Sequence, residues 1–269
     1  MDCPIISSPH YNHPLLTEAQ CDAVEVVLVS PRNPLNIGAA ARAMANFGFR
    51  HLAVVAPYAH TWREARSAVG APEILLNAAE TASLGEAVSR ATLVVGTGTL
   101  TYRKPEQRVV ALPELAPLVG RELGRGGRVA VVFGPEKHGL TRDDLSYCHI
   151  LVEIPTDARQ PSMNLGQAVA VCLYELAARA DSGAEPDRRD AELTAAPSGR
   201  LELLAGVVEE TMRAAGYSPR TMQAANRHDL RLLLRRLGLP ERDLRRILGL
   251  FRHILWRLRH APEGGRKAD

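Results

Sequence analysis

Ser162 and Asn164 stand in a polar loop between an apolar run at residues 151–155 and the clearest helical pattern of the chain at residues 165–179. Either side chain could cap that helix, because a hydroxyl or amide oxygen accepts hydrogen bonds from the free N–H groups of a first turn. A loop between a buried strand and a helix is where α/β proteins bind ligands. We therefore place the candidate site here.

Arg42 is a second candidate because it stands on an alanine-rich, mostly apolar segment, six residues after Asn36. Asn36 suits the N-cap of a helix that would end near Gly48. A guanidinium held in a cleft would bind an anion. The same side chain could equally extend from the helix into solvent, and the residues alone leave both interpretations open.

Small residues follow two further apolar runs, at Thr97-Gly98-Thr99 and at Gly134. They would let a ligand approach the backbone closely, although glycines also simply make turns. Glu136 follows Gly134, where a surface turn would explain it equally well.

Five β-branched runs predict strands at residues 24–29, 51–57, 92–95, 128–133 and 149–154. A helical pattern between the first two runs makes a βαβ unit, which favours a parallel sheet. The fold class is therefore α/β, with helices flanking the sheet.

The pattern changes along the chain, and we predict four regions. They are an extension without periodicity at 1–22, the α/β domain at 23–180, a linker of charged and small residues at 181–199, and an all-helical module at 200–269. The module shows three apolar stripes: Leu201, Leu204, Val208, Met212; Leu230, Leu233, Leu234, Leu237; and Leu244, Ile247, Leu248, Phe251, Ile254, Leu255, Leu258. So small a core favours docking on a partner.

Charge and cysteine content limit the classes of function that the chain can have. The chain has 33 Lys+Arg and 30 Asp+Glu, a net charge of +3. Residues 181–269 hold 17 Lys+Arg and 13 Asp+Glu, a net charge of +4. Residues 1–180 hold the other 16 Lys+Arg and 17 Asp+Glu, a net charge of −1. This balance permits a nucleic-acid partner without requiring one. The four cysteines show no metal spacing, and no leader or membrane-spanning run is apparent, so we expect a cytoplasmic protein with reduced thiols and no metal or membrane partner.

Three segments together resemble the SPOUT-class RNA methyltransferases, within them the TrmH/TrmJ group of ribose 2′-O-methyltransferases. They are NPLNIGAAARAM at 33–44, VFGPEKHGLT at 132–141, and IP at 154–155 with SMNLGQAV at 162–169. Each is weak alone, but their order and spacing make a specific match. The C-terminal region resembles the extension of the TrmJ branch, which modifies position 32 in the tRNA anticodon loop.

The resemblance implies a parallel sheet ending in a deep C-terminal trefoil knot, a feature otherwise almost absent from proteins. It implies S-adenosylmethionine as cofactor and tRNA as partner, in a homodimer with the active site near the dimer interface. The residues that would bind the cofactor are Thr97, Gly98, Thr99, Gly134, Ile154, Ser162 and Met163.

The resemblance also implies catalytic roles. It assigns Arg42 to the ribose hydroxyl and the adjacent phosphate. A guanidinium is a poor base, with a pKa above about 12, so either burial perturbs Arg42 or a phosphate takes the proton while Arg42 stabilises the oxyanion. We favour the second. Asn36 would orient Arg42 or bind phosphate, Ser162 and Asn164 would hold the knot loop and the Arg42 side, and Glu136 would fix the second loop through backbone or arginine donors.

Three alternative functions also come into question. A ribosomal RNA substrate would keep the same chemistry, and a non-catalytic RNA-binding protein would need only a basic surface. A Rossmann oxidoreductase is disfavoured because Pro31 and Pro34 occupy the first turn, where a G-x-G-x-x-G motif would be required. Base preference, for cytidine, uridine or both, stays open because ribose chemistry does not read the base.

Overall fold

The computed structural model describes residues 16–59, 61–99, 105–179 and 194–260. A parallel sheet of seven strands forms its centre, in the order β3-β2-β1-β6-β4-β7-β5. The strands are β1 (Val24–Val29), β2 (His51–Val55), β3 (Ala79–Thr81), β4 (Leu93–Thr97), β5 (Arg108–Ala111), β6 (Val129–Phe133) and β7 (Ile150–Glu153). The predicted α/β class with a parallel sheet is confirmed.

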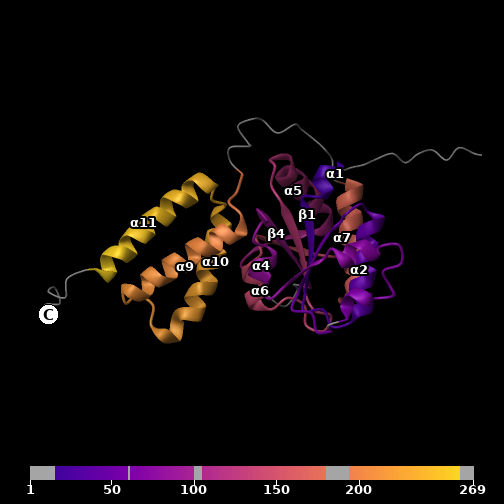
Figure 1. Cartoon of the computed structure of the whole chain (residues 1–269), viewed down its shortest axis with the longest axis horizontal. Helices are drawn as coiled ribbons and strands as arrows, with labels where there is room; N and C mark the ends of the chain where they lie inside the picture. The colour runs from indigo at the N-terminus through magenta and orange to yellow at the C-terminus, as the bar shows by residue number, and fades with distance from the viewer. Residues whose placement is uncertain (1–15, 60, 100–104, 180–193, 261–269) are drawn as a thin grey trace, which may run out of the picture.

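The sheet separates two apolar cores because successive side chains of a strand point to opposite faces. On β1, Val26 and Leu28 join one core, while Val27 and Val29 join the other. Helices α2 (Pro34–Asn46), α5 (Leu112–Gly124) and α7 (Leu165–Arg179) cover the first face, and the short helices α4 (Leu84–Ala87) and α6 (Arg142–Ser146) cover the second. Figure 1 shows the two sets on opposite sides of the sheet.

The two outermost strands, β3 and β5, are the ones that the sequence did not predict. Strand β3 consists of Ala79, Glu80 and Thr81, none of them buried, and in β5 only Val110 is buried. An edge strand pairs on one side only and needs little apolar surface. The β-branched signal is therefore weakest at the edges of the sheet.

The carboxyl ends of β1, β6, β4 and β7 lie at one edge of the sheet because the strands are parallel and adjacent. The loops that follow them start at residues 30, 134, 98 and 154. These loops carry all three motif segments. Sheet topology therefore brings together residues that are more than 100 positions apart in the chain.

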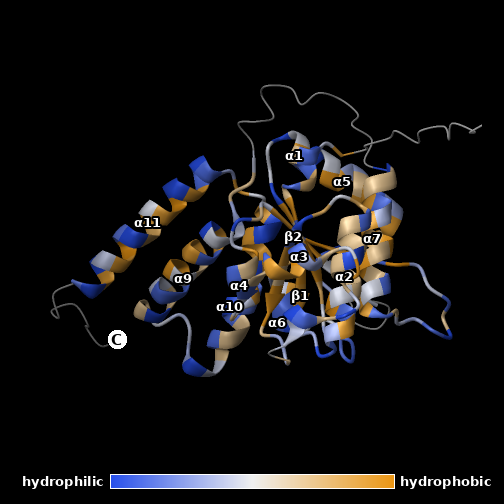
Figure 2. Ribbon diagram, turned by 45° about the vertical axis from the view of Figure 1, so that its right-hand side comes forward, coloured by the Kyte–Doolittle hydropathy of each residue, from blue (hydrophilic) through white to orange (hydrophobic). Residues whose placement is uncertain are grey.

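A separate group of helices follows, and we refer to residues 194–260 as the helical part and to residues 24–179 as the α/β part. It contains α9 (Ser198–Ala214), the 3₁₀ turn Arg220–Met222, α10 (Gln223–Leu237) and α11 (Glu241–Arg259). Figure 1 shows it on the α4 and α6 side of the sheet. In Figure 2 the hydrophobic colour is concentrated on the strands, whereas these three helices alternate between hydrophobic and hydrophilic residues.

The predicted apolar stripe of α10 is wrong at Leu233 and Leu237, whereas Leu230, partly buried, packs against the core of the helical part. Leu233 and Leu237 are 40% and 54% exposed, and of the four predicted leucines only Leu234 is buried. Arg231 and Arg235 are buried instead, because α10 packs against α6 and α9, where partners for both guanidinium groups are available. Apolar spacing alone therefore misplaced the buried face of this helix.

The end of the predicted N-terminal extension is folded. Helix α1 (Glu18–Cys21) is capped by Thr17, and Glu18 forms an ion pair with Arg50 at 2.7 Å. Leu16 and Cys21 pack into the first core. Residues 1–15 lie outside the described residues. Within the described part of the chain, no helix has the length and apolar character needed to cross a membrane.

Candidate active site

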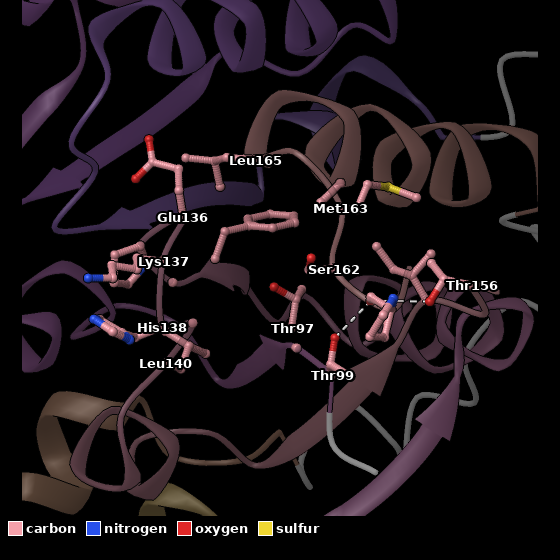
Figure 3. A pocket seen from close by; sticks show the side chains of 18 of the residues that line it. Thr97, Thr99, Glu136, Lys137, His138, Leu140, Thr156, Ser162, Met163 and Leu165 are labelled. Carbon is pink, nitrogen blue, oxygen red and sulfur yellow. Dashed lines mark hydrogen bonds between the residues drawn. The ribbon is translucent and has the colours of Figure 1, made fainter. Parts of the chain in front are cut away.

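A cleft of about 260 Å³ opens where the loops after β4, β6 and β7 meet. Figure 3 shows the side chains that line it. All seven residues that the sequence resemblance assigned to the cofactor lie on its wall: Thr97, Gly98, Thr99, Gly134, Ile154, Ser162 and Met163. The volume lies near the lower end of the range for small-molecule sites.

Hydroxyl groups tie the loops of the cleft to one another. Thr99 Oγ1 and Thr156 Oγ1 both donate to the Pro161 carbonyl, at 3.0 and 3.1 Å, as the dashed lines in Figure 3 show. Thr97 Oγ1 donates to the Val132 carbonyl at 3.0 Å. The segment just before Ser162 is therefore fixed by two threonines from different loops.

Gly134 marks a close approach of the backbone to itself at the end of β6. A Cβ atom at this position would lie 2.2 Å from the Leu140 nitrogen and 2.3 Å from the Gly139 carbonyl carbon. Real Cβ atoms do not come so near backbone atoms, so a larger residue would push the 134–140 loop open. This glycine is required by the fold of the cleft wall.

A hydrogen-bonded network joins three motif segments at one side of the cleft. Glu136 Oε1 accepts from Asn36 Nδ2 at 2.8 Å, and Asn36 Oδ1 accepts from Asn164 Nδ2 at 2.9 Å. The Glu136 carboxylate also accepts from the backbone N–H groups of Arg32 and Asn33, at 3.1 and 3.2 Å. We call Glu136, Asn36 and Asn164 the amide–carboxylate network.

The network affects the ionisation of Glu136. Burial alone would raise the pKa of this carboxyl, but hydrogen bonds from Asn36 and from backbone N–H groups outweigh it and hold the pKa below the usual range of glutamate. The ionised carboxylate is the form that accepts all these bonds. Glu136 therefore remains charged at neutral pH and keeps the loops after β1 and β6 together.

The helix caps differ in part from expectation. Asn33, not Asn36, is the N-cap of α2, and its Oδ1 accepts from the Leu35 N–H at 3.0 Å. Two prolines lie beside this cap, and Pro34 already occupies the first helical position, which places Asn36 inside the first turn and leaves its amide free for Glu136. Asn164 caps α7, with Oδ1 accepting from the Gly166 N–H at 2.9 Å.

Arg42 lies on α2 outside the cleft wall, with an exposed side chain. Among the described residues no hydrogen bond or ion pair holds its guanidinium. Two apolar residues elsewhere on α2 and α7, Leu35 and Tyr174, are 55% and 57% exposed. Ser162 lies on the cleft wall, and Figure 3 shows it near Thr97.

Sequence reasoning missed Thr156 and the pair Lys137 and His138, which also line the cleft. Thr156 stands three residues beyond the end of β7, and Thr99 stands two residues beyond the end of β4. A hydroxyl shortly after each of these strands is visible in the sequence and could have pointed to Thr156. Lys137 and His138 belong to the 132–141 segment but have no spacing that distinguishes them from ordinary turn residues.

The cleft suits a nucleoside-like ligand. Leu140, Leu165 and Met163 supply apolar wall for a flat ring, and the threonine and serine hydroxyls supply polar contacts to a sugar. Among the residues that the structure describes, no group of three or more His, Cys, Asp or Glu side chains comes together as metal ligands would.

Known proteins resemble the chain over most of its length. A Pseudomonas aeruginosa protein named tRNA (cytidine/uridine/adenosine-2′-O-)-methyltransferase TrmJ is 40% identical over 157 residues, which are 58% of this chain and 60% of that protein. A Salmonella typhimurium protein named tRNA (cytidine/uridine-2′-O-)-methyltransferase TrmJ is 31% identical over 241 residues, which are 86% of this chain and 96% of that protein. The chain thus spans only about three fifths of the Pseudomonas relative.

A solved structure and a family model agree with these relatives. The crystal structure of TrmJ from Z. mobilis ZM4 has a TM-score of 0.74 and 29% identity, and the match covers 86% of this chain and 98% of that one. Residues 23–174, more than half of the chain, match the model of the SpoU rRNA Methylase family. These residues include the whole cleft and the amide–carboxylate network. The chain therefore belongs to the SpoU rRNA Methylase family.

Proposed function

We propose that this protein is a tRNA ribose 2′-O-methyltransferase that uses S-adenosylmethionine and acts at position 32 of the anticodon loop. The observation that carries the proposal is the amide–carboxylate network, which places Asn36, Glu136 and Asn164 together at the edge of the cleft. The names of the Pseudomonas and Salmonella relatives support tRNA as the substrate and the 2′ oxygen as the acceptor atom. Position 32 rests on the resemblance of the helical extension.

S-adenosylmethionine supplies an electrophilic methyl group on a sulfonium. We assign its binding to the backbone and side chains of the cleft wall, with Thr97, Gly98 and Thr99 on one side, Gly134 and Ile154 on another, and Ser162 and Met163 closing the third. The apolar wall excludes water, which would otherwise compete for contacts with the cofactor.

The reaction needs a ribose hydroxyl that gives up its proton and whose oxygen lies in line with the methyl group. Arg42 positions the neighbouring phosphate and stabilises the developing oxyanion with its guanidinium N–H groups, and the phosphate accepts the proton. Asn36 and Glu136 hold the loop between β1 and α2, the helix on which Arg42 lies. Asn164 fixes the start of α7. Ser162 orients the acceptor side of the cleft.

The active form is a homodimer in this proposal. Arg42 has no partner in its own chain among the described residues, and exposed apolar residues lie on the same pair of packed helices, Leu35 on α2 and Tyr174 on α7. A second copy packed on α2 and α7 would cover this surface and bring Arg42 to an acceptor site shared by both chains. The protein would act in the cytoplasm, where tRNA is available.

We infer a trefoil knot from the resemblance of the three motif segments, and the loops after β4 and β7 meet at the Pro161 carbonyl, which accepts from both Thr99 and Thr156. We infer that the knotted domain spans 23–180, preceded by an extension at 1–22. A linker at 181–199 then leads to a helical module at 200–269 that holds tRNA.

Ribosomal RNA is the second candidate substrate because the matching family model is described as an rRNA methylase. The site chemistry is the same for both RNAs. A non-catalytic RNA-binding protein is the third possibility, and the presence of Arg42, Glu136, Ser162 and Asn164 together argues against it.

The test is transfer of labelled methyl from S-adenosylmethionine to bulk tRNA and, separately, to ribosomal RNA, followed by mapping of the modified nucleotide. We expect a 2′-O-methyl group in the anticodon loop. Transfer to ribosomal RNA alone would replace the substrate and keep the chemistry. Cofactor binding without transfer to either RNA would overturn both substrate assignments, and absence of cofactor binding would leave the RNA-binding alternative.

A further inference from the structure

Two exposed side chains stand side by side at the rim of the candidate active site. Tyr58 follows β2 and is 78% exposed, and the Arg32 guanidinium lies over its ring, 5.9 Å from the centroid. In the described part of the chain Arg32 makes no ion pair. A cation over an aromatic face is a favourable contact, and here both groups remain accessible to a ligand.

The backbone that presents this pair is strained. Ser30 and Ala56, the first residues after β1 and β2, have φ values of +44° and +42°. Residues other than glycine rarely adopt this left-handed conformation. The Tyr58 N–H donates to the Pro31 carbonyl at 3.2 Å, which links the two strained loops. Strain of this kind persists where a loop must hold a particular position, and it occurs often at functional sites.

The pair is also connected directly to the cleft. The Arg32 N–H donates to Glu136 at 3.1 Å, and Glu136 lines the cleft. Tyr58 therefore lies two contacts from the cleft, through Arg32 and Glu136, on the side of the amide–carboxylate network. An RNA strand whose ribose enters the cleft from this side would pass over Tyr58 and Arg32.

We propose that Arg32 and Tyr58 form an RNA contact site in which Tyr58 stacks on an unpaired base and Arg32 binds a phosphate next to the modified ribose. This inference rests on the proposed function and names the partner of that same site. Bases of single-stranded RNA loops stack readily on aromatic rings, and any base has a face that can do so. A stacking contact therefore holds the acceptor strand without selecting cytidine or uridine.

The test compares Tyr58→Ala, Tyr58→Phe and Leu76→Ala, a control that removes a 69% exposed apolar side chain at the end of α3 (Pro72–Leu76), outside the cleft and outside the helical part. Loss of one stacked base raises the KM for tRNA about ten-fold in Tyr58→Ala. Tyr58→Phe keeps the ring and stays within about two-fold of the wild type, as does Leu76→Ala. The affinity for S-adenosylmethionine is unchanged in all three, because Tyr58 lies outside the cleft wall.

Arg32→Ala tests the phosphate contact. It weakens tRNA binding and lowers the slope of log affinity against log salt concentration by about one. A KM for Tyr58→Ala equal to that of the wild type would overturn the proposal. So would a Tyr58→Phe variant as weak as Tyr58→Ala, or an unchanged salt slope in Arg32→Ala.

Failure of the methyltransferase assignment can be told apart from failure of the inference about Arg32 and Tyr58. If the wild-type protein methylates no RNA, the methyltransferase assignment fails. The binding of a labelled anticodon stem-loop RNA by the wild type and by Tyr58→Ala still decides the inference about the pair. Equal affinities of the two proteins for this RNA would overturn it.

Discussion

The α/β part and the helical part handle polar groups in opposite ways. At the cleft, polar side chains lie at an accessible rim, and the contacts among them are those of a carboxylate with neutral amides. Where the helical part meets the α/β part, two charged arginines are buried instead, with side chains 10% and 2% exposed. An accessible network can meet a substrate, whereas a buried charge is committed to partners inside the protein.

The buried arginines form the joint between the two parts. Arg231 binds Asp143 at 2.9 Å and also donates to the Tyr147 hydroxyl, while Arg235 donates to the Tyr147 carbonyl at 2.8 Å. Both reach Glu202 on α9, at 3.0 and 2.9 Å. Burial raises the pKa of Tyr147, so its hydroxyl stays neutral beside the cation. Helix α6, which carries Asp143, directly follows the 134–140 loop of the cleft, so the joint supports one wall of the site.

Arg42→Ala is expected to have the largest effect on the α/β part. It removes the charge that would stabilise the oxyanion, and about a thousand-fold loss in kcat, or about 4 kcal/mol, is expected. The dissociation constant of S-adenosylmethionine should change little, since Arg42 lies outside the cleft wall. Single-turnover methylation and calorimetric titration of the cofactor measure the two. A loss of affinity as large as the loss of activity would remove Arg42 from catalysis.

Arg235→Met is expected to have the largest effect at the joint. It leaves Glu202 with fewer partners and the Tyr147 carbonyl without its donor, at a cost of about 3 kcal/mol in the free energy of unfolding. Arg236→Met, at an exposed position of the same helix, is the control and should cost little. Denaturant unfolding compares the two. Equal stabilities would mean that apolar contacts, not the arginines, join the parts.

Glu136→Gln should lower kcat about ten-fold, because an amide accepts fewer of the bonds that fix the loops. It also tests the lowered pKa of Glu136. A carboxyl whose pKa is lowered by folding stabilises the protein above its unfolded pKa of about 4.3, and this contribution disappears as pH falls through the folded pKa.

The stability difference between wild type and Glu136→Gln should therefore be constant from about pH 8 to pH 6 and narrow below about pH 4.3. Because Glu136 is partly exposed, the whole difference should stay below about 1 kcal/mol. Thermal melts across this range provide the measurement. A gap that widens as pH falls would contradict the assigned direction of the pKa shift.

Ala56→Gly has the smallest expected effect. Glycine accepts the positive φ of +42° without strain, so the protein should gain up to about 1 kcal/mol in stability. Ala45→Gly, on an exposed position within α2, is the control and should lose about as much. Loss of stability in both variants would show that the loop after β2 is not strained.

The sequence predicted the α/β part better than the helical part. Three motif segments and five apolar runs located the cleft and the parallel sheet, since buried parallel strands are almost continuously apolar. The cap of α2 could not be placed because Asn33 and Asn36 both suit that position, and only the contact with Glu136 separates them. The buried face of α10 was misjudged because Arg231 and Arg235 depend on Tyr147 and Glu202, which no local spacing reveals.

The central claim is that the amide–carboxylate network serves a reaction at a ribose 2′ oxygen of tRNA. The most direct measurement is methyl transfer to two synthetic tRNAs that differ only at position 32, one with the ordinary ribonucleotide and the other with its 2′-deoxy counterpart. Transfer to the first and none to the second is the predicted result. Equal transfer to both would place the methyl group elsewhere and contradict the account.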